Sequence, residues 1–338
     1  MVTVYDVAAR AGVSIATVSR ALNDRARISG TTRERILRIA ADLGYEPNEI
    51  ARSLTGKASR TVALLLPDIA NPFFPELVSG VQSVTDANEH LLLLCRTSDD
   101  EQKVVRDLSI LRRKQVDGVI LVAGSLAGGP ITEQVPDFPL VLMDRDIPVT
   151  GADLVAVDHR RGARLAVEHL LDLGHRSVAH IAGPPGLPVS RARRAGWRAA
   201  LRSAGLVADT GLIRTGDFLE DGGYRATKSL LAGEAEFTAI FAANDLTAIG
   251  ALAALSESGI DVPGRMSVVG FDGIHLAKYT APTLTTVAQP IFELGRRATE
   301  LLLDRLTGER RRPEKVVLDT ELIVRGSSGP PSDGSRQR

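Results

Sequence analysis

The sequence predicts an α/β protein in which a small all-α unit precedes a core of two doubly wound parallel-sheet subdomains. In the first 46 residues, apolar side chains recur at helical spacing between capping residues. From Thr61 onward, short apolar strands alternate with helices, which indicates parallel sheets covered by helices on both faces. The chain has 338 residues, and about 265 of them in this alternating pattern suffice for two such sheets side by side.

Capping residues divide the N-terminal unit into three short helices. Thr3 can cap the first helix, and Gly12 can end it. Ser14 caps a second helix, and Ser29 or Thr31 opens a third. Two short helices joined by Gly-Val-Ser form the pattern of a helix-turn-helix.

The chain divides into four parts by composition. The predicted parts are a helix-turn-helix headpiece at 1–46, a hinge at 47–60, a core at 61–326 and a disordered tail at 327–338. The hinge, PNEIARSLTGKASR, can form one helix of two turns, which is too short to be stable alone in water. The tail consists of Ser, Pro, Gly and charged residues, with little to bury. In the core, the first subdomain is expected at about 61–158 plus 288–317, and the second at about 159–287 plus 318–326.

The composition excludes several classes of protein. No Walker loop, G-x-S-x-G elbow or G-x-G-x-x-G fingerprint occurs, so we expect neither an enzyme nor a cofactor. The single Cys95 excludes an internal disulfide, and no zinc-ligand spacing exists, so no metal is expected. No apolar run approaches the ~20 residues of a membrane span, and the N-terminus does not read as a signal peptide. A cytoplasmic protein is therefore expected.

Charge is unevenly distributed although the formal net charge is zero. Residues 1–60 hold ten Lys and Arg and six Asp and Glu, a net charge of +4, so the remainder carries −4. A basic head on an acidic body permits contact with DNA phosphates.

The most specific functional signal is the segment VYDVAARAGVSIATVSRALN. Hydroxyl groups on its two helices can donate to phosphate oxygens, and apolar side chains suit thymine methyl groups. Arg20 can reach the O6 and N7 atoms of a guanine. The predicted contacts to DNA in the headpiece are Tyr5, Ser14, Ile15, Ala16, Thr17, Ser19, Arg20, Asn23, Ser29 and Thr32. The alternative is a helical hairpin of another fold, with Arg20 simply solvated.

This segment resembles the headpiece of the lactose-repressor (LacI/GalR) family. The resemblance continues through TTRERILRIAADLGYEPNEIARSLTGK and then, element by element, to about Arg325. It implies a transcriptional regulator that binds a near-palindromic operator as a homodimer. Leu54 matches the family's wedge in the central minor groove, and Asn48 and Ala51 match its neighbours. The alternative for Leu54 is a linker residue that packs on the core.

Polar and aromatic residues follow the predicted strands, where open α/β folds bind ligands. Carboxylate, guanidinium and amide groups suit a ring of hydroxyls, and aromatic rings suit the apolar faces of a sugar. The candidate effector site consists of Asn71, Phe73, Phe74, Asp144, Arg145, Arg193, Phe218, Asn244, Asp272 and Gln289. As structural alternatives, Asn71 can cap a helix, Trp197 can belong to the core, and Asp245 is expected to cap the helix that follows it.

These positions resemble the ribose site of periplasmic sugar-binding proteins, to which this family's core is related. The resemblance implies a monosaccharide effector, with a pentose such as ribose favoured. A nucleobase is disfavoured, because Leu187 and Val189 stand where nucleobase-binding members carry Arg and Thr. The alternatives are a nucleobase, a sugar phosphate or a protein corepressor.

Overall fold

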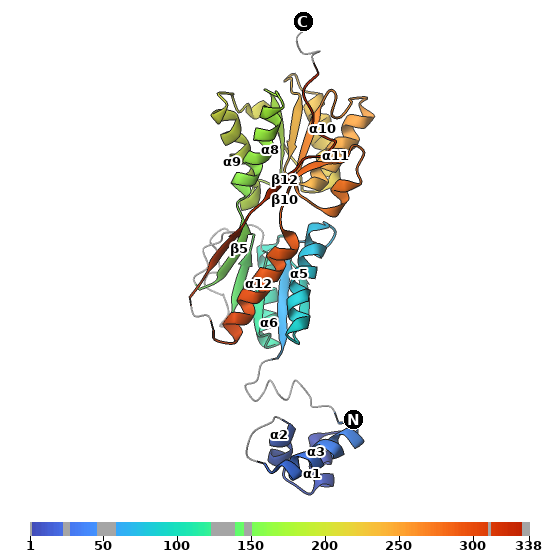
Figure 1. Cartoon of the computed structure of the whole chain (residues 1–338), viewed down its shortest axis with the longest axis vertical. Coiled ribbons are helices and arrows are strands. Elements are labelled where there is room, and N and C mark those ends of the chain that lie inside the picture. Colours follow the sequence, from blue (N-terminus) through green and yellow to red (C-terminus); the bar gives the residue numbers. More distant parts are fainter. Residues whose placement is uncertain are drawn as a thin grey trace. The chain divides into compact units, whose positions relative to one another are not determined.

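A computed structural model of the chain describes residues 2–22, 28–45, 59–122, 139–144, 151–309 and 312–332. The chain forms two compact units, Met1–Ser59 and Arg60–Arg338 (Figure 1). The first contains the headpiece, and the second contains both sheets. Asn23, Asn48, Ala51, Leu54 and Arg145, which the sequence predicts to bind DNA or effector, lie outside the described residues.

The headpiece contains three helices around a small apolar core. They are α1 (Val4–Ala11), α2 (Ile15–Leu22) and α3 (Gly30–Asp42). Thr3 and Asp6 form a reciprocal capping box at the start of α1, and Gly12 ends that helix with a φ of 63°. Ser29 caps α3 by accepting from the backbone N–H of Thr32. The predicted helix starts at Thr3 and Ser29 are therefore confirmed.

Two six-stranded sheets form the core of the second unit. The first sheet has the order β11-β5-β4-β3-β1-β2, and all its strands run parallel. Its strands are β1 (Thr61–Leu66), β2 (Leu91–Arg96), β3 (Gly118–Leu121), β4 (Leu140–Met143), β5 (Asp153–Val157) and β11 (Lys315–Leu318). The second sheet has the order β12-β10-β9-β8-β6-β7, and only β12 runs antiparallel to its neighbour. Its strands are β6 (Val178–Ala182), β7 (Ile213–Thr215), β8 (Ala239–Ala242), β9 (Ser267–Asp272), β10 (Thr285–Ala288) and β12 (Glu321–Ile323). The predicted fold class is confirmed.

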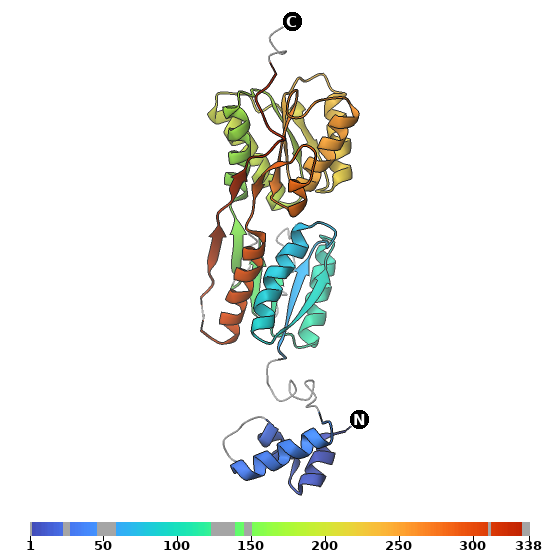
Figure 2. The same cartoon turned by 45° about the vertical axis from the view of Figure 1, so that its right-hand side comes forward.

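Helices cover both faces of each sheet, as Figures 1 and 2 show. On the first sheet, α5 (Phe73–Ala87) and α12 (Ile291–Leu306) pack on one face and α6 (Glu101–Arg113) on the other. On the second, α8 (His159–Asp172) and α9 (Pro188–Ser203) share one face. The opposite face carries α10 (Glu220–Leu231) and α11 (Asp245–Glu257). Both faces are buried, which explains why the central strands are continuously apolar.

The chain crosses between the two sheets three times. It leaves β5 of the first sheet for α8, returns from β10 to α12, and passes from β11 to β12. The sequence pattern does not predict β7, β11 and β12 as strands. Each has three or four residues and lies at a sheet edge with half-exposed or exposed side chains, so none shows a continuous apolar run.

The expected disorder of the tail is wrong for residues 327–332. Ser327 is fully buried, its carbonyl accepts from the backbone N–H of Val268, and its hydroxyl donates to the carbonyl of Val268. Farther on, the ring of His175 hydrogen-bonds to the carbonyl of Gly329 at 2.9 Å. The segment is polar because it pairs with β9 through its backbone and hydroxyls, which the composition does not reveal. Residues 333–338 lie outside the described part of the chain.

One buried histidine gives the second sheet a dependence on pH. His180 on β6 lies between Phe241 and Trp197, with ring centroids 5.0 and 5.7 Å away, and hydrogen-bonds to the carbonyl of Phe241. Complete burial lowers the pKa of His180 to about 4 from the usual 6.5. Between pH 4 and pH 6.5, His180 is therefore protonated in the unfolded chain but neutral in the folded chain.

We predict that His180→Phe lessens the loss of stability in mild acid. As pH falls from 7.5 to 5, the depressed pKa should cost the wild type about 2 kcal/mol of unfolding free energy, a cost that the Phe variant lacks. Urea unfolding of both proteins across this range measures the difference. The raised pKa values of other buried acids occur in both proteins and cancel. Stability curves that stay parallel would contradict the prediction.

Candidate functional site

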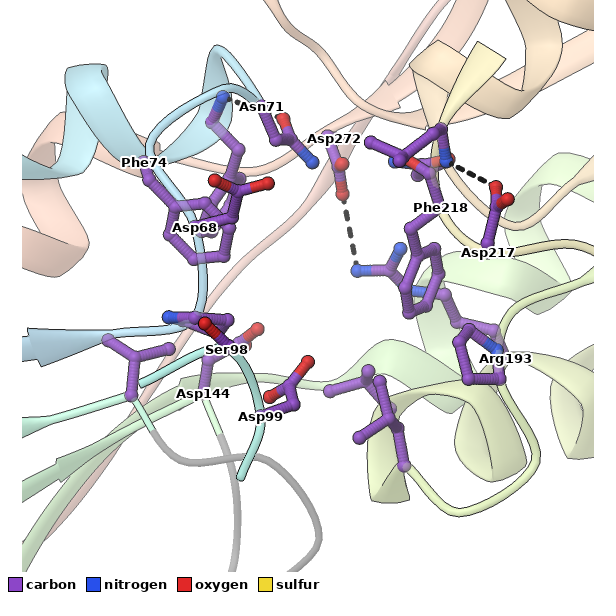
Figure 3. A pocket seen from close by; sticks show the side chains of 18 of the residues that line it. Asp68, Asn71, Phe74, Ser98, Asp99, Asp144, Arg193, Asp217, Phe218 and Asp272 are labelled. Carbon is purple, nitrogen blue, oxygen red and sulfur yellow. Dashed lines mark hydrogen bonds and ion pairs between the residues drawn. The ribbon is translucent and has the colours of Figure 1, made fainter. Parts of the chain in front are cut away.

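A cavity of about 240 Å³ opens where the strands of the two sheets end (Figure 3). It takes residues from loops after β1 and β4 of the first sheet and from the ends of β8, β9 and β10 of the second. Nine of the ten residues predicted to bind an effector line it: Asn71, Phe73, Phe74, Asp144, Arg193, Phe218, Asn244, Asp272 and Gln289. Sequence positions more than 200 residues apart therefore meet in one site.

Arg193 is the most constrained cation in this pocket. Its side chain is 4 % exposed, and its guanidinium forms an ion pair with Asp272 at 3.2 Å and donates to the carbonyl of Ala243 at 2.5 Å. The carbon at the centre of the guanidinium lies 3.9 Å from the centroid of the Phe271 ring. The cation–π contact and the ion pair with a buried carboxylate replace the interactions with water that the guanidinium loses on burial. Ala243, Asp272 and His159 engage four of its five N–H groups, so one N–H on Nη1 remains for a ligand.

Asp272 and Gln289 form the second part of the polar ring. The amide nitrogen of Gln289 donates to Asp272 at 2.8 Å, while its buried Oε1 has no hydrogen-bond partner among the described residues. Burial raises the pKa of Asp272 to about 6, although the charge of Arg193 and the bond from Gln289 oppose this shift. Asp272 is therefore ionised at neutral pH. The orphaned acceptor of Gln289 suits a donor such as a sugar hydroxyl.

Asn244 caps a helix besides lining the cavity, and the role of Asp245 differs from the one predicted. Asn244, not Asp245, caps α11 by accepting from the backbone N–H of Thr247, and its amide also donates to the carbonyl of Phe218. Asp245 is fully buried and accepts from the backbone N–H groups of Gly273 and Ile274, both at 2.8 Å. Burial, and then the charge of Asp272, raise the pKa of Asp245 to about 8. Asp245 thus fixes the turn that carries Asp272, which capping propensity could not show.

Three phenylalanines form part of the apolar surface of the pocket. Phe73 is 5 % exposed and belongs to the core of the first subdomain, and Phe74 meets it edge to face at 5.2 Å. Asn71 accepts from the backbone N–H of Phe73, so its predicted capping role is present too. Phe218 lies against Gly183, where an added Cβ would meet the ring at 2.2 Å. Glycine at 183 therefore makes room for Phe218.

Left-handed backbone is concentrated around the cavity. Among the described residues other than glycine, eight have φ between 50° and 119°. Five of these eight line the pocket: Ser98, Asp99, Asp144, Phe218 and Asp272. Such conformations cost about 1 kcal/mol or more each, and they gather at functional sites where the surrounding structure enforces them.

The sequence analysis missed a charged part of the lining. Asp68 and Arg96 form an ion pair at 3.5 Å, and Ser98, Asp99 and Asp217 also line the pocket. Asp68 follows β1, and Arg96 ends β2 just before Ser98 and Asp99, so the rule that ligands bind at strand ends could have found these four residues. Asp217 follows β7, which the sequence does not mark as a strand. Leu187 and Val189, the positions that disfavour a nucleobase, also line the cavity. Altogether the lining contains five aspartates and two arginines.

Other candidates belong to the structure rather than to the site. Trp197 is completely buried and donates to the carbonyl of Val178, so it is a core residue. His175 hydrogen-bonds to Thr238 and Ser267 and is a structural residue. In the described part of the chain, no three His, Cys, Asp or Glu residues are grouped so as to hold a metal ion. The described helices include none with the length and apolar character to cross a membrane.

The headpiece presents a second candidate surface. Ser14, Ile15, Ala16, Ser19 and Arg20 are exposed on or beside α2, and Thr17 is half-buried. Tyr5 is 68 % exposed on α1. Caps engage some of the predicted phosphate donors: Ser14 Oγ accepts from the backbone N–H of Thr17, and Ser29 Oγ donates to Thr32 Oγ1 at 2.8 Å. Thr32 Oγ1 accepts in the second bond, so its own hydroxyl hydrogen remains for a phosphate oxygen, whereas Ser29 already donates its hydrogen to Thr32.

The headpiece and the core both match known families. Residues 3–48 match the family model of bacterial regulatory proteins, lacI family, and residues 167–328 match a periplasmic binding protein-like domain. The fold and the helix-turn-helix define a DNA-binding transcriptional regulator. The chain is 39 % identical over 332 residues to the HTH-type transcriptional regulator DegA of Bacillus subtilis (strain 168), covering 97 % of this chain and 98 % of the relative. The chain belongs to the LacI family.

Further similarities concern proteins whose names mention ribose or an operator. The chain is 37 % identical over 326 residues to the ribose operon repressor of Halalkalibacterium halodurans, covering 96 % of each. It resembles the Lac repressor dimer bound to operator and the anti-inducer ONPF, with a TM-score of 0.87, 29 % identity and coverage of 97 % of this chain and 99 % of that one. A LacI family regulator from Enterococcus faecium with bound ribose gives a TM-score of 0.73 at 33 % identity, covering 80 % and 99 %.

We predict that Asp245→Ala destabilises the protein far more than Asp245→Asn. Alanine leaves the amides of Gly273 and Ile274 buried without an acceptor, which should cost about 3 kcal/mol of unfolding free energy. Asparagine keeps one acceptor oxygen and should cost about 1 kcal/mol or less. Urea unfolding at pH 7 measures both. Equal losses for the two variants would show that the contacts of the carboxylate with the turn are unimportant.

Proposed function

We propose that this protein is a homodimeric repressor whose affinity for a near-palindromic operator is controlled by a neutral monosaccharide, with a pentose such as ribose favoured. The observation that carries the effector assignment is the polar ring of Arg193, Asp272 and Gln289, with a buried acceptor on Gln289 that has no partner among the described residues. A sugar hydroxyl can donate to that acceptor and accept from Arg193. Phe74 and Phe218 beside the ring suit the apolar face of a sugar.

The charge of the lining favours a neutral ligand over a phosphorylated one. Five aspartates face two arginines around the cavity, and Arg193 is already paired with Asp272. A phosphate would add negative charge to this acidic surface, and its repulsion from the buried Asp144 and Asp272 would be weakly screened by water. Leu187 and Val189 offer no polar side-chain group to a nucleobase. The ribose operon repressor and the ribose-bound regulator among the similar proteins support the same ligand class.

Control of DNA binding follows from the position of the pocket between the two subdomains of the core. An effector that contacts both subdomains favours one angle between them. We propose that this angle sets the spacing of the two hinge segments in the dimer, and that the sugar thereby releases the operator. The effector must bind the two arrangements with different affinity for this control to work.

We predict that Gln289→Leu abolishes most sugar binding. A thermal-shift screen of the wild type against pentoses, hexoses, polyols, sugar phosphates and nucleobases should give a selective response to one free sugar. At ~100 times its dissociation constant, that sugar should add about 2.7 kcal/mol of stability. Gln289→Leu should weaken its binding at least tenfold in calorimetry, and Gln102→Leu on the exposed side of α6 should not change it. A response only to sugar phosphates or nucleobases would refute the proposed effector class.

We predict that Arg20→Ala lowers operator affinity selectively. An operator is first selected in vitro with the wild-type protein, and binding is then measured by fluorescence anisotropy on the selected and a scrambled duplex at one salt concentration. Loss of a contact to guanine should weaken binding to the selected duplex about 10- to 100-fold and to the scrambled duplex much less. Arg10→Ala, at an exposed position of α1, is the matched control. Equal losses on both duplexes would make Arg20 a phosphate contact instead.

A further inference from the structure

His159 occupies a position that the proposed effector site does not yet explain. It is the first residue of α8, directly after the first crossing from β5 to the second subdomain, and it is 7 % exposed. The resemblance to sugar-binding sites did not point to it, and it is not among the residues that line the cavity. It contacts Asp144 and Arg193, two residues that do line the cavity and that come from different subdomains.

The contacts of His159 define which ring nitrogen carries the proton. Nε2 lies 2.7 Å from Oδ1 of Asp144, while Nδ1 lies 3.3 Å from Nη2 and 3.4 Å from Nε of Arg193. A guanidinium can only donate, so Nδ1 accepts and Nε2–H donates to the carboxylate. The neutral imidazole thus accepts from the guanidinium of Arg193 and donates to the carboxylate of Asp144.

Both partners of His159 are otherwise fixed within their own subdomains. Asp144 follows β4 with a left-handed φ of 60°, and its backbone N–H donates to the carbonyl of Val155 on β5. Arg193 is held by Asp272, the carbonyl of Ala243 and the face of Phe271. The imidazole therefore bridges a carboxylate anchored to the first sheet and a guanidinium anchored to the second.

We propose that His159 is a positioning residue that joins the two halves of the effector pocket. Its imidazole sets the separation of the Asp144 carboxylate and the Arg193 guanidinium, and so determines whether one ligand can contact both. This inference rests on the proposed function. Because α8 begins at a crossing between the subdomains, a change in their angle alters the bond from His159 to Asp144, and effector binding opposes that change.

The test compares His159→Phe with His159→Gln by isothermal titration calorimetry, using the free sugar that gives the largest thermal shift with the wild type. Phenylalanine keeps the ring that packs 5.8 Å from Phe271 but removes both hydrogen bonds. Glutamine can donate to Asp144 and accept from Arg193 as the imidazole does. His169→Phe is the control, because His169 lies on the same helix and contacts Ser328 instead of the pocket.

The proposal expects at least tenfold weaker sugar binding by His159→Phe, near-wild-type binding by His159→Gln, and no change in the control. Thermal melting without sugar checks that the variants fold. Phe preserves the packing of the ring better than Gln does, so recovery of sugar binding in His159→Gln would show that the hydrogen bonds, not the packing, position the pocket. Unchanged affinity in a folded His159→Phe, or equal losses in both variants, would overturn the role of His159 while leaving the proposed function intact. If no free sugar binds the wild type, the proposed effector class fails and this inference fails with it.

Discussion

The buried guanidinium of Arg193 is the group on which the arrangement of the pocket depends. Removing an arginine and its partner carboxylate from water is costly, and the mutual attraction of the pair repays this only when further hydrogen bonds complete the geometry. Here the ion pair with Asp272 is completed by a backbone carbonyl, an imidazole nitrogen and an aromatic face. Ala243 follows β8, Phe271 and Asp272 are the last two residues of β9, and His159 begins α8. Satisfying one charge thus fixes the ends of several elements at once.

A second set of buried groups, around Asp245, holds the backbone of Asp272 in place. Asp272 has a backbone φ of 119°, which a residue other than glycine adopts only when its surroundings enforce it. The enforcing group is Asp245, whose carboxyl oxygens accept from the next two backbone amides and from the hydroxyl of Thr286 on β10. Since Gln289 follows the same strand, Asp245 connects the ends of β8, β9 and β10, which together carry three of the pocket residues. The raised pKa of Asp245 is the cost of placing this anchor where no water reaches it.

Much of this arrangement could be predicted from the sequence, because the residues carry local signals. Central strands such as β1 and β8 are buried on both faces and therefore read as apolar runs, and a polar residue directly after such a strand lies at the sheet edge where ligands bind. That rule located Asn71, Asp144, Asn244, Asp272 and Gln289 among the pocket residues. It did not locate β7, β11 or the segment after Gly326, whose order comes from edge pairing and from serine hydroxyls bonded to distant backbone. Nor could it separate Asn244 from Asp245, since both suit the start of a helix and only the fold shows which one faces the turn at Gly273.

The pocket draws its residues from both sheets, and this has a consequence for any molecule that fills it. A ligand bound only to Asp272, Asn244 and Arg193 would touch one subdomain and could not distinguish between angles of the core. A ligand that also reaches Asp144 or Asn71 spans the crossings, so its affinity must depend on the angle. By thermodynamic linkage, whatever else fixes that angle alters the affinity of the ligand by the same factor. A coupling of 1.4 kcal/mol corresponds to a tenfold change in affinity. One or two hydrogen bonds across the crossings, of the strength expected for a bond to a charged group, are enough to supply it.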